Sequence, residues 1–233
     1  SMMITLVLST ISLMIPMSLL TQKGYHSLWV WPILLIAIFF IVNFIITNRQ
    51  ATHPIVHFHT LFSKKPFVGA TMAISSHLTL LTGIAGINVY IVRILKLPFD
   101  ISLHFYFFFF VGVIITGILK MFFYSSVGAG FLGTLGSSAL LYVSIHWIIL
   151  GNTINIPLLY IQGLLLGFGA SMTLVSGSMA TLLDGDLKEA AQRSQTMHTI
   201  RNFSAAMLIP IIAYTIKNHI QKGTQSIYAE NIT

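Results

Sequence analysis

The sequence predicts an all-α integral membrane protein with about seven transmembrane helices. Three features predict this class: 55% of the 233 residues are hydrophobic, only 7% are charged, and the mean hydropathy is +0.87. Soluble domains carry about 25% charged residues, so this composition does not provide a hydrated surface. The apolar residues come in runs of roughly 20, the length of a helix that crosses the hydrocarbon core of a bilayer. We therefore expect a multi-pass protein of the cell (inner) membrane.

The predicted spans follow the apolar runs and are separated by short polar connectors. They cover residues 3–22, 28–47, 67–93, 101–122, 126–150, 156–182 and 196–216. Pro16 and Pro210 fall inside spans, where neighbouring helices satisfy the carbonyls that a proline leaves free. Residues 1–50 thus form two helices, residues 67–216 form five, and residues 217–233 form a polar tail.

The connector of residues 51–66 is amphipathic, and we expect it to lie in the membrane interface. Its stretch "HPIVHFH" holds His53, His57 and His59, and His53 and His57 would meet on one side of a helix. A metal site needs three or four converging ligands, and nothing nearby supplies the others. We therefore predict no metal site and read these histidines as interfacial groups facing water.

The charged residues exclude several classes of function. The net charge is +7, but the twelve Lys and Arg are scattered between apolar runs, singly except for Lys64 and Lys65, which suits anchoring at lipid headgroups. Because no basic stripe exists, no nucleic-acid partner is expected. The chain has no cysteine and no Walker, HExxH or GxSxG motif, so neither an enzyme nor a cofactor is predicted. An intramembrane enzyme would need converging histidines and acids, and the acidic residues near the spans lie outside them: Asp100, Asp184, Asp186 and Glu189.

Polar side chains inside the spans are the candidate functional groups, because burying them in lipid without a partner is unfavourable. His77, Asn88 and Gln162 are candidates for lining a substrate cavity, although each could instead bond a neighbouring helix. Arg201 keeps its charge in any protein environment, and Asn202 follows it. If the last helix begins near residue 195, Arg201 lies about 9 Å along it, within snorkelling range of the headgroups. The alternative is a gating or structural charge that faces a polar cavity or a carboxylate on another helix.

Glycines in the sixth predicted span indicate close helix packing. Gly163 and Gly167 are four residues apart and share one helix face, and Gly169 follows them. Small residues at this spacing let helices approach closely. A role in a substrate path is the other reading.

Three stretches resemble a known family when they are taken in order. "NRQATHPIVHFHTLFSKKPFVGA", "INVYIVRILKL" and residues 163–207 are similar to segments of the fourteen-helix drug:proton antiporters of the major facilitator superfamily. In that comparison Arg201 falls on the family's arginine and Ala190-Ala191 on its pair of small residues. Ser204 and Ala205 stand where the family prefers glycine, and Lys96 replaces another glycine.

The resemblance implies a partial major-facilitator fold, with the two inserted helices followed by five helices of the C-terminal bundle. It further implies part of a permease for proton-coupled efflux of apolar or cationic drugs, powered by the proton gradient. The family's proton-carrying acids lie in its N-terminal half, so a missing N-terminal half or partner helices are the expected partners, besides lipid and a small-molecule substrate. The alternative of another class is a truncated, non-transporting remnant or a membrane scaffold.

Overall fold

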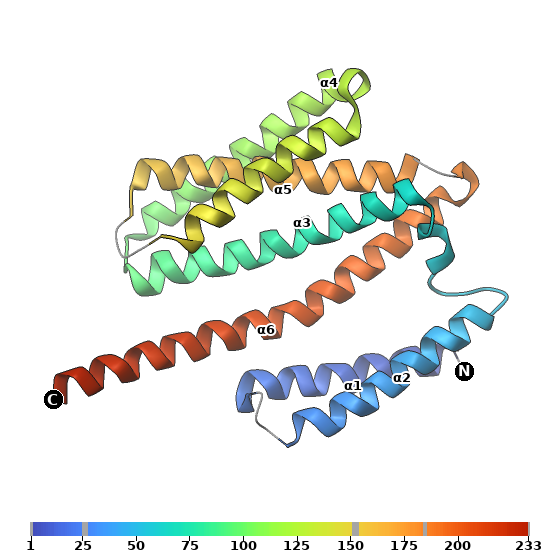
Figure 1. Ribbon diagram of the computed structural model, residues 1–233, viewed down its shortest axis with the longest axis horizontal. Coiled ribbons are helices and arrows are strands. Elements are labelled where there is room, and N and C mark those ends of the chain that lie inside the picture. Colours follow the sequence, from blue (N-terminus) through green and yellow to red (C-terminus); the bar gives the residue numbers. More distant parts are fainter. Residues whose placement is uncertain (1, 25–27, 151–153, 184–185, 233) are drawn as a thin grey trace. The chain divides into compact units, whose positions relative to one another are not determined.

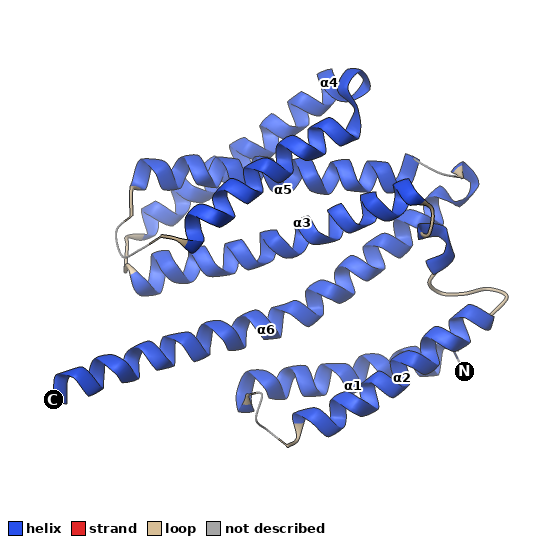
Figure 2. Cartoon of the chain, in the orientation of Figure 1, coloured by secondary structure: helices blue, strands red, loops and turns tan. Residues whose placement is uncertain are grey.

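The computed structural model describes residues 2–24, 28–150, 154–183 and 186–232, and in these residues every regular element is a helix (Figure 2). Six helices are long and apolar enough to cross a membrane. The predicted helical class is therefore confirmed for the described residues. The number of continuous helices differs from the number of predicted spans by one, and α4 accounts for the difference.

Helix α4, Phe99–Ile148, is a 50-residue element that folds back on itself at Gly128 (Figure 1). A straight helix of that length would measure about 75 Å, more than twice the hydrocarbon thickness of a bilayer. Gly128 has φ 80° and ψ 169°, a conformation essentially restricted to glycine. It divides α4 into a first arm, residues 99–127, and a second arm, residues 129–148. These arms correspond to the predicted spans 101–122 and 126–150.

The chain forms two compact units, residues 1–56 with 203–233 and residues 57–202. In the first unit, α1 (Met2–Lys23) and α2 (Val30–Gln50) pack against each other as the two predicted N-terminal helices. Most of their large apolar side chains are exposed, as expected for helices that face lipid. Asn48, in the last turn of α2, binds the connector through two hydrogen bonds. Its Nδ2 donates to the Val56 carbonyl at 2.7 Å, and its Oδ1 accepts from the Val56 N–H at 3.1 Å.

The connector contains a single short 3-10 helix, η1 (Phe58–Leu61), and no α-helix before residue 64. The sequence-based idea that His53 and His57 meet on a helix is therefore wrong. The cause is local: the paired hydrogen bonds between Asn48 and Val56 hold the chain in a non-helical path.

In the second unit, α5 (Ile156–Leu183) is the central helix. It packs against both arms of α4 and against α3, which runs over Lys64–Val89 and ends in the π-helical turn η2 (Tyr90–Ile94) (Figure 1). Half of the residues in its most apolar stretch are buried, more than in any other of the six membrane-length helices. A core cluster joins the three helices through seven buried residues: Ile87, Ile91, Phe105, Leu140, Leu159, Leu166 and Ala170.

Helix α6 covers Ala190–Ile232 and follows the short 3-10 helix η3 (Leu187–Glu189). It begins six residues before the predicted span 196–216. It also continues through residues 217–232, so the polar tail that the sequence predicts is helical in its described part. Residues 190–202 of α6 belong to the second unit and residues 203–232 to the first.

Candidate functional site

A groove of about 360 Å³ lies in the second unit, between α3 and the second arm of α4. Five of its lining side chains carry hydroxyl groups, and the remaining three are apolar. The lining residues are Met72, Ser75, Ser76, Thr79, Ser137, Leu140, Leu141 and Ser144. Apolar side chains combined with hydrogen-bonding groups are typical of small-molecule sites.

The groove arises because each of its two walls is a single helix face. On α3 the lining residues have the spacing i, i+3, i+4, i+7, starting from Met72, and the second arm repeats that spacing from Ser137. Residues at this spacing lie along one side of a helix. Two such faces opposite each other therefore bring hydroxyl groups of both helices into one groove.

The groove hydroxyls differ in how much of their bonding capacity remains for a ligand. Ser76 donates to the Met72 carbonyl at 2.7 Å and Thr79 donates to the Ser75 carbonyl at 2.8 Å, both inside α3. Within the described residues Ser75, Ser137 and Ser144 make no side-chain hydrogen bond, so they can donate to or accept from a ligand or water. No lining residue is charged. The groove thus offers hydrogen bonds without a net charge.

None of the three cavity candidates predicted from the sequence lines this groove. Asn88 accepts a hydrogen bond from the Tyr106 hydroxyl of the first arm of α4. Gln162 is 2% exposed; its Oε1 accepts from Trp147 Nε1 at 2.8 Å, and its Nε2 lies 2.8 Å from His146 Nδ1. In this structure Asn88 and Gln162 join neighbouring helices.

His77 and Arg201 lie near each other, on α3 and α6. Both are half-buried, and the guanidinium is close enough for its charge to act on the imidazole. The one hydrogen bond of Arg201 among the described residues is a long one, 3.4 Å from Nη2 to the neighbouring Asn202 Oδ1.

The glycines predicted for packing lie where α5 approaches α4 closely. A Cβ atom added at Gly163 would lie 2.9 Å from the Phe105 ring, and one at Gly169 would lie 2.8 Å from the Gly136 carbonyl oxygen. One at Gly167 would collide with the carbonyl of Phe109. These glycines permit α5 to contact both arms of α4.

Arg193 is a structural residue that the sequence interpretation missed. It is 1% exposed, and its guanidinium donates from Nε to the Thr181 carbonyl and from Nη2 to the Leu182 carbonyl, both at 2.9 Å. Nη1 donates to the carbonyl of Asp186. Carbonyls in the last turn of a helix have no partner inside that helix. Arg193 therefore caps the C-terminal end of α5, and no spacing pattern in the sequence signals this role.

Lys120 makes a second polar contact that the sequence did not reveal. Its Nζ donates to Ser176 Oγ at 3.0 Å and lies 5.4 Å from the centre of the Tyr124 ring. The contact links the first arm of α4 to α5.

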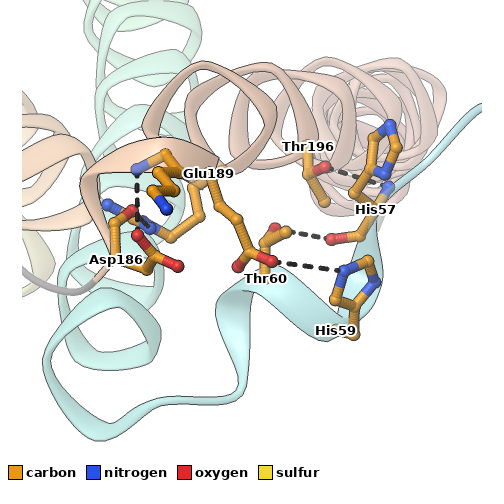
Figure 3. A network of polar contacts seen from close by, with 8 residues as sticks. His57, His59, Thr60, Asp186, Glu189 and Thr196 are labelled. Atoms are coloured by element: carbon orange, nitrogen blue, oxygen red, sulfur yellow. Dashed lines mark hydrogen bonds and ion pairs between the residues drawn. The ribbon is translucent and has the colours of Figure 1, made fainter.

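Two histidines of the connector, His57 and His59, belong to a polar network near the start of α6, shown in Figure 3. The backbone N–H of His57 donates to Thr196 Oγ1 at 3.1 Å, and Thr60 Oγ1 donates to the His57 carbonyl at 2.6 Å. His59 Nε2 lies 3.9 Å from Glu189 Oε1. The network ties the connector to the segment that precedes and begins α6.

The histidine and acidic side chains of the described residues do not form a metal site. The described part of the chain contains no group of three such side chains that could hold a metal ion. Asp186 accepts a hydrogen bond from the backbone N–H of Lys188, and Asp100 lies in the first turn of α4. Asp184 lies outside the described residues.

No protein-family model matches the chain, and no curated protein matches its sequence.

Proposed function

We propose that this chain forms part of a membrane permease for small apolar molecules, and that the groove between α3 and the second arm of α4 is its solute site. The hydroxyl-lined groove is the observation that supports this function. A helix face directed at lipid gains nothing from repeated hydroxyls, whereas a solute path needs weak hydrogen-bonding groups along an apolar wall.

The neutral lining favours uncharged solutes that carry a hydrogen-bonding group. Of the drug classes that the sequence resemblance suggests, apolar molecules fit this groove better than cations, because no carboxylate lines it. Binding then depends on burying apolar surface, and the free hydroxyls of Ser75, Ser137 and Ser144 orient the solute.

The placement of acidic residues supports a requirement for partner helices if transport is coupled to protons. In the described residues the acids lie near helix ends: Asp100, Asp186, Glu189 and Glu230. A proton carrier must lie within the membrane-spanning part of a transporter. We therefore propose, in line with the resemblance to the drug:proton antiporters, that helices of another segment supply the acids.

Single-cysteine labelling tests the groove, since the chain contains no native cysteine. Ser137→Cys places a thiol in the groove, and Ser138→Cys places one on the neighbouring helix position outside it. Methanethiosulfonates react with the thiolate, which forms in water and not in hydrocarbon, so we expect modification in membrane vesicles to be at least about tenfold faster at position 137. Nile red, an uncharged apolar dye, should slow that reaction, and tetraphenylphosphonium should slow it less.

Equal reaction rates at the two positions, or no protection by either Nile red or tetraphenylphosphonium, would contradict the solute site. Those results would favour the non-transporting scaffold or remnant. Protection by tetraphenylphosphonium alone would contradict the preference for uncharged solutes while leaving the site in place.

A further inference from the structure

Two arginines eight residues apart on α6 have opposite surroundings. Arg193 uses all three guanidinium nitrogens to bond carbonyls. Arg201 makes one long hydrogen bond to Asn202, and its buried Nε has no hydrogen-bond partner in the described residues. A guanidinium presents five N–H donors and remains charged, so Arg201 retains most of its bonding capacity for a group from outside this chain.

His198 adds a second unused nitrogen beside Arg201. It lies three residues earlier on α6, hence on the same face of the helix. Its Nδ1 is buried and also has no partner among the described residues. The Arg201 charge acts on this imidazole, as it does on His77.

The packing of α3 against the start of α6 explains how His77 joins the other two. Ala73 of α3 and Met197 of α6 belong to one buried cluster. His77 and Arg201 each lie four residues further along their own helices, which is about one turn from that contact. Both residues belong to the second unit.

No acidic side chain neutralises this group in the part of the chain that the structure describes. Glu189 instead lies 3.9 Å from His59, in the connector network. Arg201 lies about 16 Å along α6 from its first residue, Ala190, at 1.5 Å per residue. An unpaired charge at such a position on a membrane-spanning helix is unfavourable unless an anion meets it.

We infer that His77, His198 and Arg201 form a binding site for the oxyanion headgroup of an amphiphile, namely a phosphate or carboxylate attached to an apolar tail. Arginine binds these planar or tetrahedral groups through paired hydrogen bonds, and the imidazole nitrogens supply further donors. The tail would lie along the apolar surface of the helices of the second unit. The headgroup could come from an anionic bilayer lipid or from a free amphiphile. The inference does not rest on the solute groove, which none of these three residues lines.

Native mass spectrometry of the full chain in a neutral maltoside detergent tests the site. The probes are dioctanoyl phosphatidylglycerol for a lipid source and decyl phosphate for a free amphiphile. Dioctanoyl phosphatidylcholine is the zwitterionic reference, and its tails match those of the phosphatidylglycerol. We expect the chain to bind at least one anionic probe at least about tenfold more strongly than the reference, as charge-assisted hydrogen bonds imply. Arg201→Gln should remove this preference, and Arg201→Lys should retain part of it because the charge stays while the planar fork is lost.

The matched control is Arg93→Gln, which removes the same charge at an exposed position of η2 and should leave the preference unchanged. If Arg201→Gln fails to fold by circular dichroism, the double variant His77→Gln, His198→Gln provides the same test and should weaken the preference. A preference for phosphatidylglycerol alone assigns the site to a lipid, and one for decyl phosphate alone assigns it to a free amphiphile. Absence of any anion preference in the wild-type chain, or its persistence in a folded Arg201→Gln variant, would overturn the inference.

Discussion

Replacing Arg193 by alanine should destabilise the second unit more than any other removal of a single charge at this end of the bundle. The substitution deletes hydrogen bonds to the carbonyls of Thr181, Leu182 and Asp186 from a side chain that is 1% exposed. A buried acceptor left without a partner costs about 1–3 kcal/mol. Asp186 is exposed, so water can satisfy its carbonyl. Water can also enter the space that the large side chain leaves, so we use the lower limit for the Thr181 and Leu182 carbonyls and expect a loss of about 2 kcal/mol.

The loss is measurable by unfolding in mixed micelles of a neutral detergent and increasing dodecyl sulfate, followed by far-ultraviolet circular dichroism. Lys188→Ala is the matched control: it removes one positive charge from the same segment, but the Lys188 side chain is exposed. Arg193→Lys should fall between the two, because one ammonium cannot reach three carbonyls at once. Equal unfolding midpoints for Arg193→Ala and Lys188→Ala would refute the capping role.

Two glycine substitutions separate backbone strain from steric contact. Gly128→Ala should destabilise the fold by about 1–3 kcal/mol through its positive φ alone, because an added Cβ would meet no neighbouring group within 4 Å. The control Gly130→Ala is equally open but helical, and it should be neutral or stabilising. If Gly130→Ala were the less stable variant in the same unfolding assay, the fold-back at Gly128 would be contradicted. Gly167→Ala should lower the free energy of unfolding by about 1–3 kcal/mol, because its Cβ meets a rigid backbone carbonyl of α4. Gly117→Ala is the control, since the space around an added Cβ there is open. Equal stability of the two variants would contradict the close packing of α4 on α5.

The groove and the anion site differ in how far the sequence alone could have found them. The groove's spacing of i, i+3, i+4, i+7 is present in the sequence twice, from Met72 and from Ser137. It carries little information by itself, because serines in membrane helices commonly bond carbonyls of their own helix, as Ser76 does. Only the arrangement of α3 opposite the second arm of α4 shows that the two faces line one space.

Arg193 and Arg201 show the same limit for charged residues. In the sequence Arg193 lies in a polar segment after a span, which is an ordinary position for an exposed cation. The structure buries it and leaves Arg201 with unused donors, because the end of α5 turns its free carbonyls toward Arg193. Hydrogen-bond partners distant in sequence decide which arginine is structural.

Composition and hydropathy by themselves determined that the chain is helical and built from membrane-length segments. Burying apolar side chains in lipid requires backbone groups to be satisfied within each segment, and a helix does this locally. The positions of the spans follow from that local requirement. The fold-back of α4 at Gly128, the central place of α5, the groove and the cluster of His77, His198 and Arg201 were decided only by the tertiary structure. They depend on which helix faces come together, and that choice is made by contacts between residues far apart in the chain.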